Sequence, residues 1–96
     1  MLLQLEIMEE IENITDALNV LFEKGSKLAV SDVGVAAAAL RCAAEGAALN
    51  VYINTKLMKD KRFAQDQNKK AEEIIARVIP KFEKIYLKVK ESLITE

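Results

Sequence analysis

The feature that most constrains the fold is an apolar spacing of three and four residues, which recurs in three segments of this 96-residue chain. In the first segment the stripe consists of Ile7, Ile11, Ile14, Leu18 and Leu21. This spacing places its members on one face of an α-helix. Lys24 and Gly25 then provide a cation in the last turn and a residue that tolerates left-handed geometry. The sequence therefore predicts a first helix that ends near residue 24 and a short connection over residues 25–30.

A second helix is expected to begin at Ser31 or Asp32, because either side chain can accept a hydrogen bond from the free N–H groups of a first turn. Its predicted apolar stripe is Val35, Ala39, Cys42, Gly46, Leu49 and Ile53. Alanines keep its other faces small. The β-branched residues near Val51 and Thr55 would also suit a strand, but a lone strand has no partner. We therefore expect the helix to continue to about Leu57.

Lys59–Asp60–Lys61 interrupts the pattern, and a third helix is predicted from about Arg62 to Leu93. Its stripe is Ile75, Val78, Phe82, Ile85, Val89 and Ser92. Pro80 removes one backbone hydrogen bond, so we expect a kink near residues 76–79 rather than an end. The predicted fold class is all-α, an antiparallel bundle of three long helices that forms one helical domain over residues 1–96. Rods of this length expose apolar flanks, which favours a homo-oligomer, here a dimer.

The composition argues against several classes of function. The chain has 14 basic and 15 acidic residues, so its net charge of −1 leaves no field to attract nucleic acid or a membrane surface. No apolar run is long enough to span a bilayer, and the start lacks the features of a signal peptide, so we expect a cytoplasmic protein. Histidine is absent and Cys42 is the single cysteine. We therefore expect no metal cofactor, and we expect Cys42 to lie in the core.

The stretch from Ser31 to Asn54 differs from a plain amphipathic helix, because it joins a polar start, small residues and two asparagines one turn apart. Asp32 is the candidate catalytic residue: a carboxylate at a helix N-terminus can take a proton or orient a water. The alternative is a helix cap, worth about 1 kcal/mol. Ser31 is likewise either a cap or a group that hydrogen-bonds a ligand. Asn50 and Asn54 suit either a ligand ring with paired donors and acceptors or bonds between helices.

The span from about Ala17 to Phe63 resembles the C-terminal half of the formiminotetrahydrofolate cyclodeaminase and methenyltetrahydrofolate cyclohydrolase family. The matching residues are Lys24–Gly25, Val30–Ser31–Asp32, Ala43–Ala48, Leu49–Asn54, Asp60 and Phe63. Members of that family are all-helical homodimers with a folate-binding groove. They release ammonia from a formimino group on tetrahydrofolate, or they open or close the methenyl ring.

The resemblance implies a folate-dependent one-carbon enzyme that acts on 5-formimino- or 5,10-methenyl-tetrahydrofolate, with the tetrahydrofolate derivative as substrate. In that interpretation Asp32 helps to move the proton, while Ser31, Arg41, Asn50 and Asn54 position the folate. Arg41 would bind the glutamate tail, although pairing with Glu45 one turn away is the alternative. Tyr52 and Lys56 are further candidates for the groove.

The sequence also departs from the family. Family members are about twice as long, and their N-terminal half carries a Pro-Gly-Gly-Gly-Ser-type motif that has no counterpart here. The family loop usually places Gly-Asn before the Ser-Asp pair, whereas this chain has Gly25–Ser26–Lys27–Leu28. These departures favour an incomplete or partner-requiring chain. They also leave open a function of another class, namely a non-catalytic helical oligomerisation or interaction module that retains only the fold.

Overall fold

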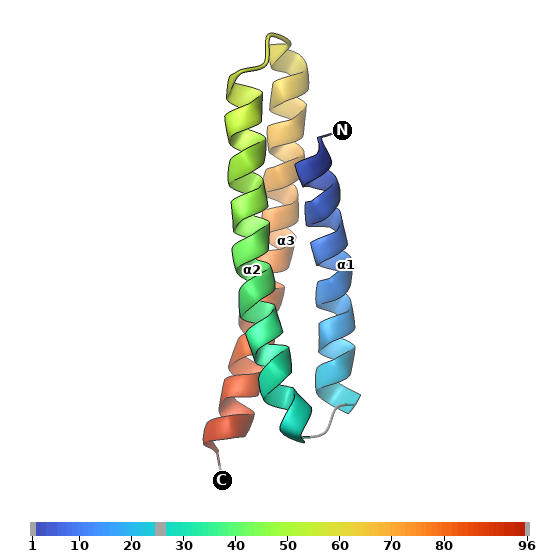
Figure 1. The fold of residues 1–96 in the computed structure, drawn as a ribbon, viewed down its shortest axis with the longest axis vertical. Coiled ribbons are helices and arrows are strands. Elements are labelled where there is room, and N and C mark those ends of the chain that lie inside the picture. The colour runs from blue at the N-terminus through green and yellow to red at the C-terminus, as the bar shows by residue number, and fades with distance from the viewer. Residues whose placement is uncertain (1, 25–26, 96) are drawn as a thin grey trace.

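The computed structural model describes residues 2–24 and 27–95, without the side chains of residues 27–29. Three helices lie side by side: α1 (Leu3–Lys24), α2 (Lys27–Lys56) and α3 (Lys61–Ile94). Each runs antiparallel to the one before it, in a rod of 56 × 19 × 15 Å (Figure 1). The predicted all-α antiparallel bundle of three long helices is confirmed.

The helix bounds agree with the sequence prediction except at one end. α1 ends at Lys24 as expected, and Gly25 lies outside the described residues. α2 begins at Lys27, so the prediction that Ser31 or Asp32 caps it is wrong. The residues before Ser31 are helix formers, and Val30 is buried against the core, so the helix gains packing by starting earlier.

The end of α2 and the bounds of α3 follow the prediction closely. α2 ends at Lys56, and α3 continues through Pro80 as a helix. The turn between them is closed by Asp60, whose Oδ1 accepts a hydrogen bond from the backbone N–H of Phe63 at 3.0 Å. This bond satisfies one of the free N–H groups of the first turn of α3.

The core lies along the axis where the three helices meet, and it is made of a single apolar cluster. Its members include Leu5, Met8, Ile11 and Leu18 of α1, Val30, Val33, Ala37, Ala44 and Val51 of α2, and Ile74, Val78, Phe82, Ile85 and Val89 of α3. The predicted stripe of α3 is largely confirmed, with Ser92 exposed at its end. In α1 two of the five predicted residues, Ile11 and Leu18, are buried, whereas Ile7, Ile14 and Leu21 are exposed.

The predicted stripe of α2 does exist, but it faces away from the core. Val35, Leu49 and Ile53 are exposed, and so is Cys42, which was expected to be buried. α2 instead turns its alanine-rich side inward, with Ala37 and Ala44 completely buried. Small side chains allow close packing against the larger residues of α3.

Two partly buried polar contacts connect α3 to the segments packed against it. The hydroxyl of Thr55, on α2, lies 2.6 Å from Oδ1 of Asn68, on α3. Oε1 of the buried Gln67 accepts a hydrogen bond from the backbone N–H of Leu2 at 3.2 Å. These contacts satisfy polar groups inside the bundle and fix the N-terminal end of α1 against α3.

An ion pair between α1 and α3 should make stability depend on pH. Nε and Nη2 of the Arg77 guanidinium donate to the two carboxylate oxygens of Glu12, at 2.7 and 3.0 Å. These hydrogen bonds lower the pKa of Glu12 below its ordinary value of 4.5, despite the opposing effect of partial burial. A carboxylate with a lowered pKa stabilises the fold above its unfolded pKa, and that stabilisation is lost as the pH falls through the folded pKa.

We therefore expect Glu12→Gln to lower the free energy of unfolding by about 0.5–1 kcal/mol at pH 7, a modest value because the pair is partly solvated. The difference from wild type should shrink as the pH falls through the lowered pKa of folded Glu12. Urea unfolding at pH 7 and in acid measures this. Glu10→Gln, on the exposed side of α1, is the control and should behave as wild type at both. A difference that persisted in acid would contradict the assignment.

Candidate functional site

An apolar groove lies between α2 and α3. It consists of two cavities of about 360 Å³ each, which share Ala38 and Tyr86 in their walls. Its other principal walls are Ser31, Gly34 and Arg41 from α2 and Glu83, Leu87, Lys90 and Leu93 from α3. The surface is mainly apolar with a few polar groups at its edges. This combination is typical of sites for small organic ligands.

Arg41 stands at one end of this α2–α3 groove and is held by two carboxylates. Its guanidinium lies 3.1 Å from Glu45, on its own helix, and 3.1 Å from Glu83, on α3. These carboxylates, Glu45 foremost, raise the pKa of Arg41. The predicted pair with Glu45 is confirmed. Glu83 is a second partner that the sequence pattern did not reveal, because the contact spans two helices.

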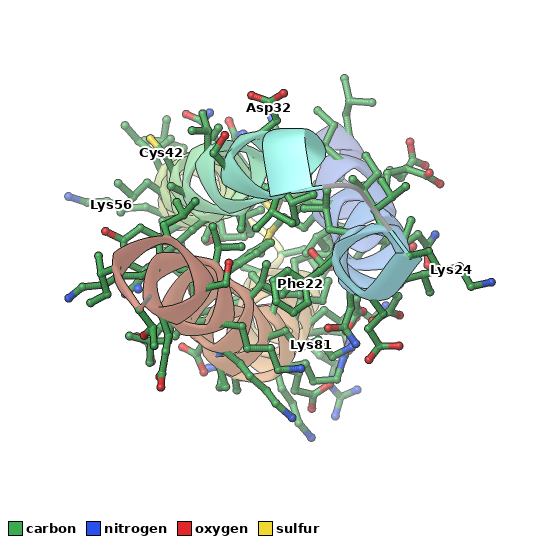
Figure 2. All side chains as sticks on the ribbon, turned by 90° about the horizontal axis from the view of Figure 1, so that it is seen from below. Phe22, Lys24, Asp32, Cys42, Lys56 and Lys81 are labelled. Carbon is green, nitrogen blue, oxygen red and sulfur yellow. The ribbon has the colours of Figure 1, made fainter. Side chains whose placement is uncertain are left out.

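Ser31 and Asp32 are neighbours in sequence but have different surroundings. Ser31 lines the far end of the groove, beside Tyr86 and Leu93. Asp32 is exposed, and its carboxylate points away from the bundle on the outer side of α2 (Figure 2). Within the described residues it makes no hydrogen bond or ion pair. The structure therefore places Ser31 in the groove and Asp32 outside it.

Asn50 and Asn54 lie far along α2 from the groove. Asn50 is exposed and Asn54 is half-buried, and neither side chain forms a hydrogen bond within the described part of the chain. The expected bonds between helices are thus not made by these amides; Thr55 and Asn68 make one instead. At a rise of about 1.5 Å per residue, Asn50 lies about 27 Å from Asp32 along the helix axis. One chain therefore does not bring the candidate catalytic group and the asparagines together.

The structure adds groove residues that sequence reasoning missed. Tyr86, Leu87 and Lys90 form much of the α3 wall, and Tyr86 contributes to both cavities. The sequence does contain a signal for two of these groove residues, because Tyr86 and Leu87 are large side chains that lie outside the predicted buried stripe. The other tyrosine, Tyr52, lies away from the groove and packs against the core. Burial raises the pKa of Tyr52, and Glu72 adds to the effect.

The described helices contain neither a cluster of metal-binding side chains nor a membrane-spanning segment. Over the residues that the structure covers, no three histidine, cysteine or acidic side chains come close enough together to hold a metal ion. In the same part of the chain, no helix has the length and apolar character that crossing a bilayer requires.

Comparison with known sequences now gives the family. The profile of the formiminotransferase-cyclodeaminase family matches residues 1–73, which is most of the chain. The chain belongs to this family. The match covers all five candidate residues, whereas the α3 wall of the groove, from Phe82 onward, lies beyond it.

A curated relative supports the same assignment for this cyclodeaminase-family chain. The chain is 35% identical over 80 residues to methenyltetrahydrofolate cyclohydrolase from Methylorubrum extorquens (strain ATCC 14718 / DSM 1338 / JCM 2805 / NCIMB 9133 / AM1). The aligned region covers 83% of this chain but only 38% of the relative. The chain thus spans about two fifths of the length of that enzyme. No solved structure matches the chain.

Proposed function

We propose that this chain is part of a folate-dependent one-carbon enzyme that acts on 5-formimino- or 5,10-methenyl-tetrahydrofolate. The observation that carries the proposal is the family match over residues 1–73, which contains every candidate site residue. The relative from Methylorubrum extorquens, named for its action on methenyltetrahydrofolate, supports the choice of substrate class. Since the chain spans 38% of that relative, the catalytic unit includes a second polypeptide segment or a second chain.

The α2–α3 groove offers a place for the folate. A tetrahydrofolate derivative carries flat rings at one end and glutamate carboxylates at the other. The rings suit the apolar wall around Tyr86, and a carboxylate suits the guanidinium of Arg41, which can bind it in a bidentate manner. Ser31 would hydrogen-bond the ligand at the far end. We assign Asp32 the role of proton carrier, with Asn50 and Asn54 as folate-binding amides, in an assembly that brings these groups together.

The assembly we propose is a homo-oligomer, most simply a dimer, that works in the cytoplasm without a metal ion. Large exposed side chains on the outer faces of the bundle support the oligomer, among them Val35, Leu49 and Ile53. The mixed charge of the surface, with a net charge of −1, argues against nucleic acid or a membrane as partner.

Calorimetric titration with 5-formyl-tetrahydrofolate, a stable analogue of the formimino substrate, tests folate binding. We expect saturable binding in the micromolar range. Arg41→Leu should weaken it by about tenfold, because a charge-assisted hydrogen bond to the carboxylate is lost. Glu83→Gln should strengthen binding, because it frees Arg41 from one competing carboxylate.

Arg62→Leu is the matched control, since Arg62 is exposed on α3 outside the groove, and it should leave binding unchanged. A folded helical chain that takes up no ligand would contradict folate binding by this chain. Binding that was unchanged by both Arg41→Leu and Glu83→Gln would place the folate outside the α2–α3 groove.

A second function, from another class, is favoured by one specific observation. The candidate residues are spread along α2 rather than gathered in one pocket, and Asp32 points into solvent (Figure 2). This arrangement suits a non-catalytic helical interaction module that retains the family fold. Absence of folate binding together with stable self-association would favour that function.

A further inference from the structure

The outer side of α1 carries an apolar stripe that the bundle leaves uncovered. We define the α1 outer stripe as Leu3, Ile7, Glu10, Ile14, Ala17 and Leu21, all of which are exposed. Its four large apolar members have relative exposures of 45–64%. The spacing alternates between four and three residues, so that Ile7, Ile14 and Leu21 lie seven residues apart. A repeat of seven residues is the pattern of a seam that packs against another helix.

The bundle occupies the other sides of α1. The core takes a separate set of its residues, among them Leu5, Met8 and Ile11. Two of its carboxylates, Glu12 and Asp16, are paired with cations of α3. Neither group includes a member of the α1 outer stripe, so the stripe is available to a further helix.

The charge of α1 indicates what kind of helix suits the stripe. α1 carries six carboxylates and a single lysine, whereas cations outnumber carboxylates on α3. Glu6 and Glu10 lie one turn apart on either side of Ile7, and neither takes part in an ion pair within the part of the chain that the structure describes. Two like charges at this spacing repel each other. A cation from outside the bundle would relieve that repulsion.

We propose that the α1 outer stripe docks an amphipathic helix of a separate polypeptide, with an apolar seam of seven-residue repeat and basic residues facing Glu6 and Glu10. That polypeptide completes the catalytic unit, so the inference rests on the function proposed above. α1 lies wholly within the family match over residues 1–73. The relative from Methylorubrum extorquens has the larger part of its length outside the aligned region.

A second copy of this chain suits the stripe less well. A parallel pair of α1 helices would set Glu10 against its own copy. An antiparallel pair with Leu3 opposite Leu21 would set each Glu10 against Ile14 of the other copy, and burying a carboxylate against an apolar side chain is costly. Pairing α1 with the basic α3 of another copy joins unlike faces, which produces an open chain of molecules unless the rotation closes a ring.

Two synthetic peptides test the chemistry of the partner. Each is an amphipathic helix of three heptads with the same leucine seam, flanked by lysines in one peptide and by glutamates in the other. Fluorescence anisotropy of the labelled peptides with the purified chain measures their affinities. We expect the basic peptide to bind about tenfold more tightly than the acidic one. Equal affinities, or no binding of the basic peptide, would overturn the proposal.

A substitution within the seam tests the place of binding. Ile14→Asp should weaken binding of the basic peptide by about tenfold while the chain keeps its helical circular dichroism, because it places a charge in the apolar seam. Leu57→Asp is the matched control, since Leu57 is an exposed apolar residue beyond the end of α2, and it should leave binding unchanged. Equal effects of the two variants would place the peptide elsewhere and overturn the proposal.

A charge reversal tests the role of Glu10. Glu10→Lys should lower the preference for the basic peptide by about tenfold, because an attractive contact becomes repulsive. Glu91→Lys makes the same change of charge on α3 and should keep the preference. If both variants lost the preference equally, net charge rather than the stripe would be its origin.

The source of the helix is tested with the part of the Methylorubrum extorquens enzyme that lies outside the aligned region, co-expressed with the tagged chain. We expect it to co-purify with wild type and to be lost with Ile14→Asp. Failure to co-purify with wild type, or recovery that Ile14→Asp leaves unchanged, would overturn the assignment of the partner.

Sedimentation velocity of Ile14→Asp completes the test. We expect the same oligomeric state as for wild type, and a change would assign the stripe to a second copy and overturn the proposal. Because no folate enters these measurements, docking on α1 can fail while folate binding stands, and the reverse.

Discussion

Replacing Phe82 with alanine is expected to lower the free energy of unfolding by about 3–4 kcal/mol. Phe82 is the largest of the fully buried side chains, with a relative exposure of 1%, and it lies in the core between α3 and its two neighbours. Truncation removes its buried apolar area and leaves a cavity that long, regular helices cannot easily close. For a small domain this is a large share of the total stability.

Chemical unfolding of wild type and Phe82→Ala, at one fixed protein concentration, measures the effect. Phe63→Ala is the control, because Phe63 lies on the same helix with a relative exposure of 39%. The same truncation there should change stability by less than about 1 kcal/mol. Similar losses for the two variants would show that the core is not centred on Phe82.

The second large effect is expected at Gly34, where α2 passes close to Val89 of α3. A Cβ at this position would lie 2.7 Å from Cγ1 and 3.2 Å from Cβ of the buried Val89. We expect Gly34→Leu to lower the free energy of unfolding by about 3 kcal/mol, because the side chain has to push the two helices apart. The gain in helix propensity from replacing a glycine is smaller, about 1 kcal/mol.

A double-mutant cycle with Val89→Ala isolates this contact. Removing the two methyl groups of Val89 should make room for the new side chain, so the double variant should be more stable than the sum of the two single effects. Purely additive losses would mean that Gly34 is required for another reason. Thermal melting followed by circular dichroism supplies all four values.

Much of the fold follows from local patterns in the sequence. The three helices, the break before Asp60 and the passage through Pro80 all come from apolar spacing and turn chemistry, which depend on neighbouring residues. The start of α2 was mispredicted because Ser31 and Asp32 are good caps in isolation. Whether a cap is used depends on how far the buried side of the helix extends, here to Val30.

The orientation of α2 could not be predicted from its own pattern. A helix with alanine on most faces has two sides that can be buried: a small side that permits close packing and a side with larger residues such as Leu49. The choice depends on the shapes of α1 and α3. For the same reason Cys42 lies on the surface, although its spacing puts it on an apolar stripe.

The candidate site could be predicted only in part. Residue type and spacing select Arg41 and its partner Glu45, which lie on one helix. The α3 wall of the groove, including Tyr86 and Glu83, depends on the register between two helices and has no local signature. Periodicity along a single helix likewise says nothing of the distance between Asp32 and Asn50 in an assembly.

The hydrogen bond between Leu2 and Gln67 indicates which end of the chain is better suited to carry a label. This hydrogen bond holds the start of α1 beside the first part of α3 (Figure 1). Leu93 and Ile94, near the other terminus, line the groove. An affinity tag or fluorophore attached after Ile94 would therefore sit at the mouth of the groove and compete with a ligand. A label attached ahead of Leu2 would emerge well away from it and report on binding without obstructing it.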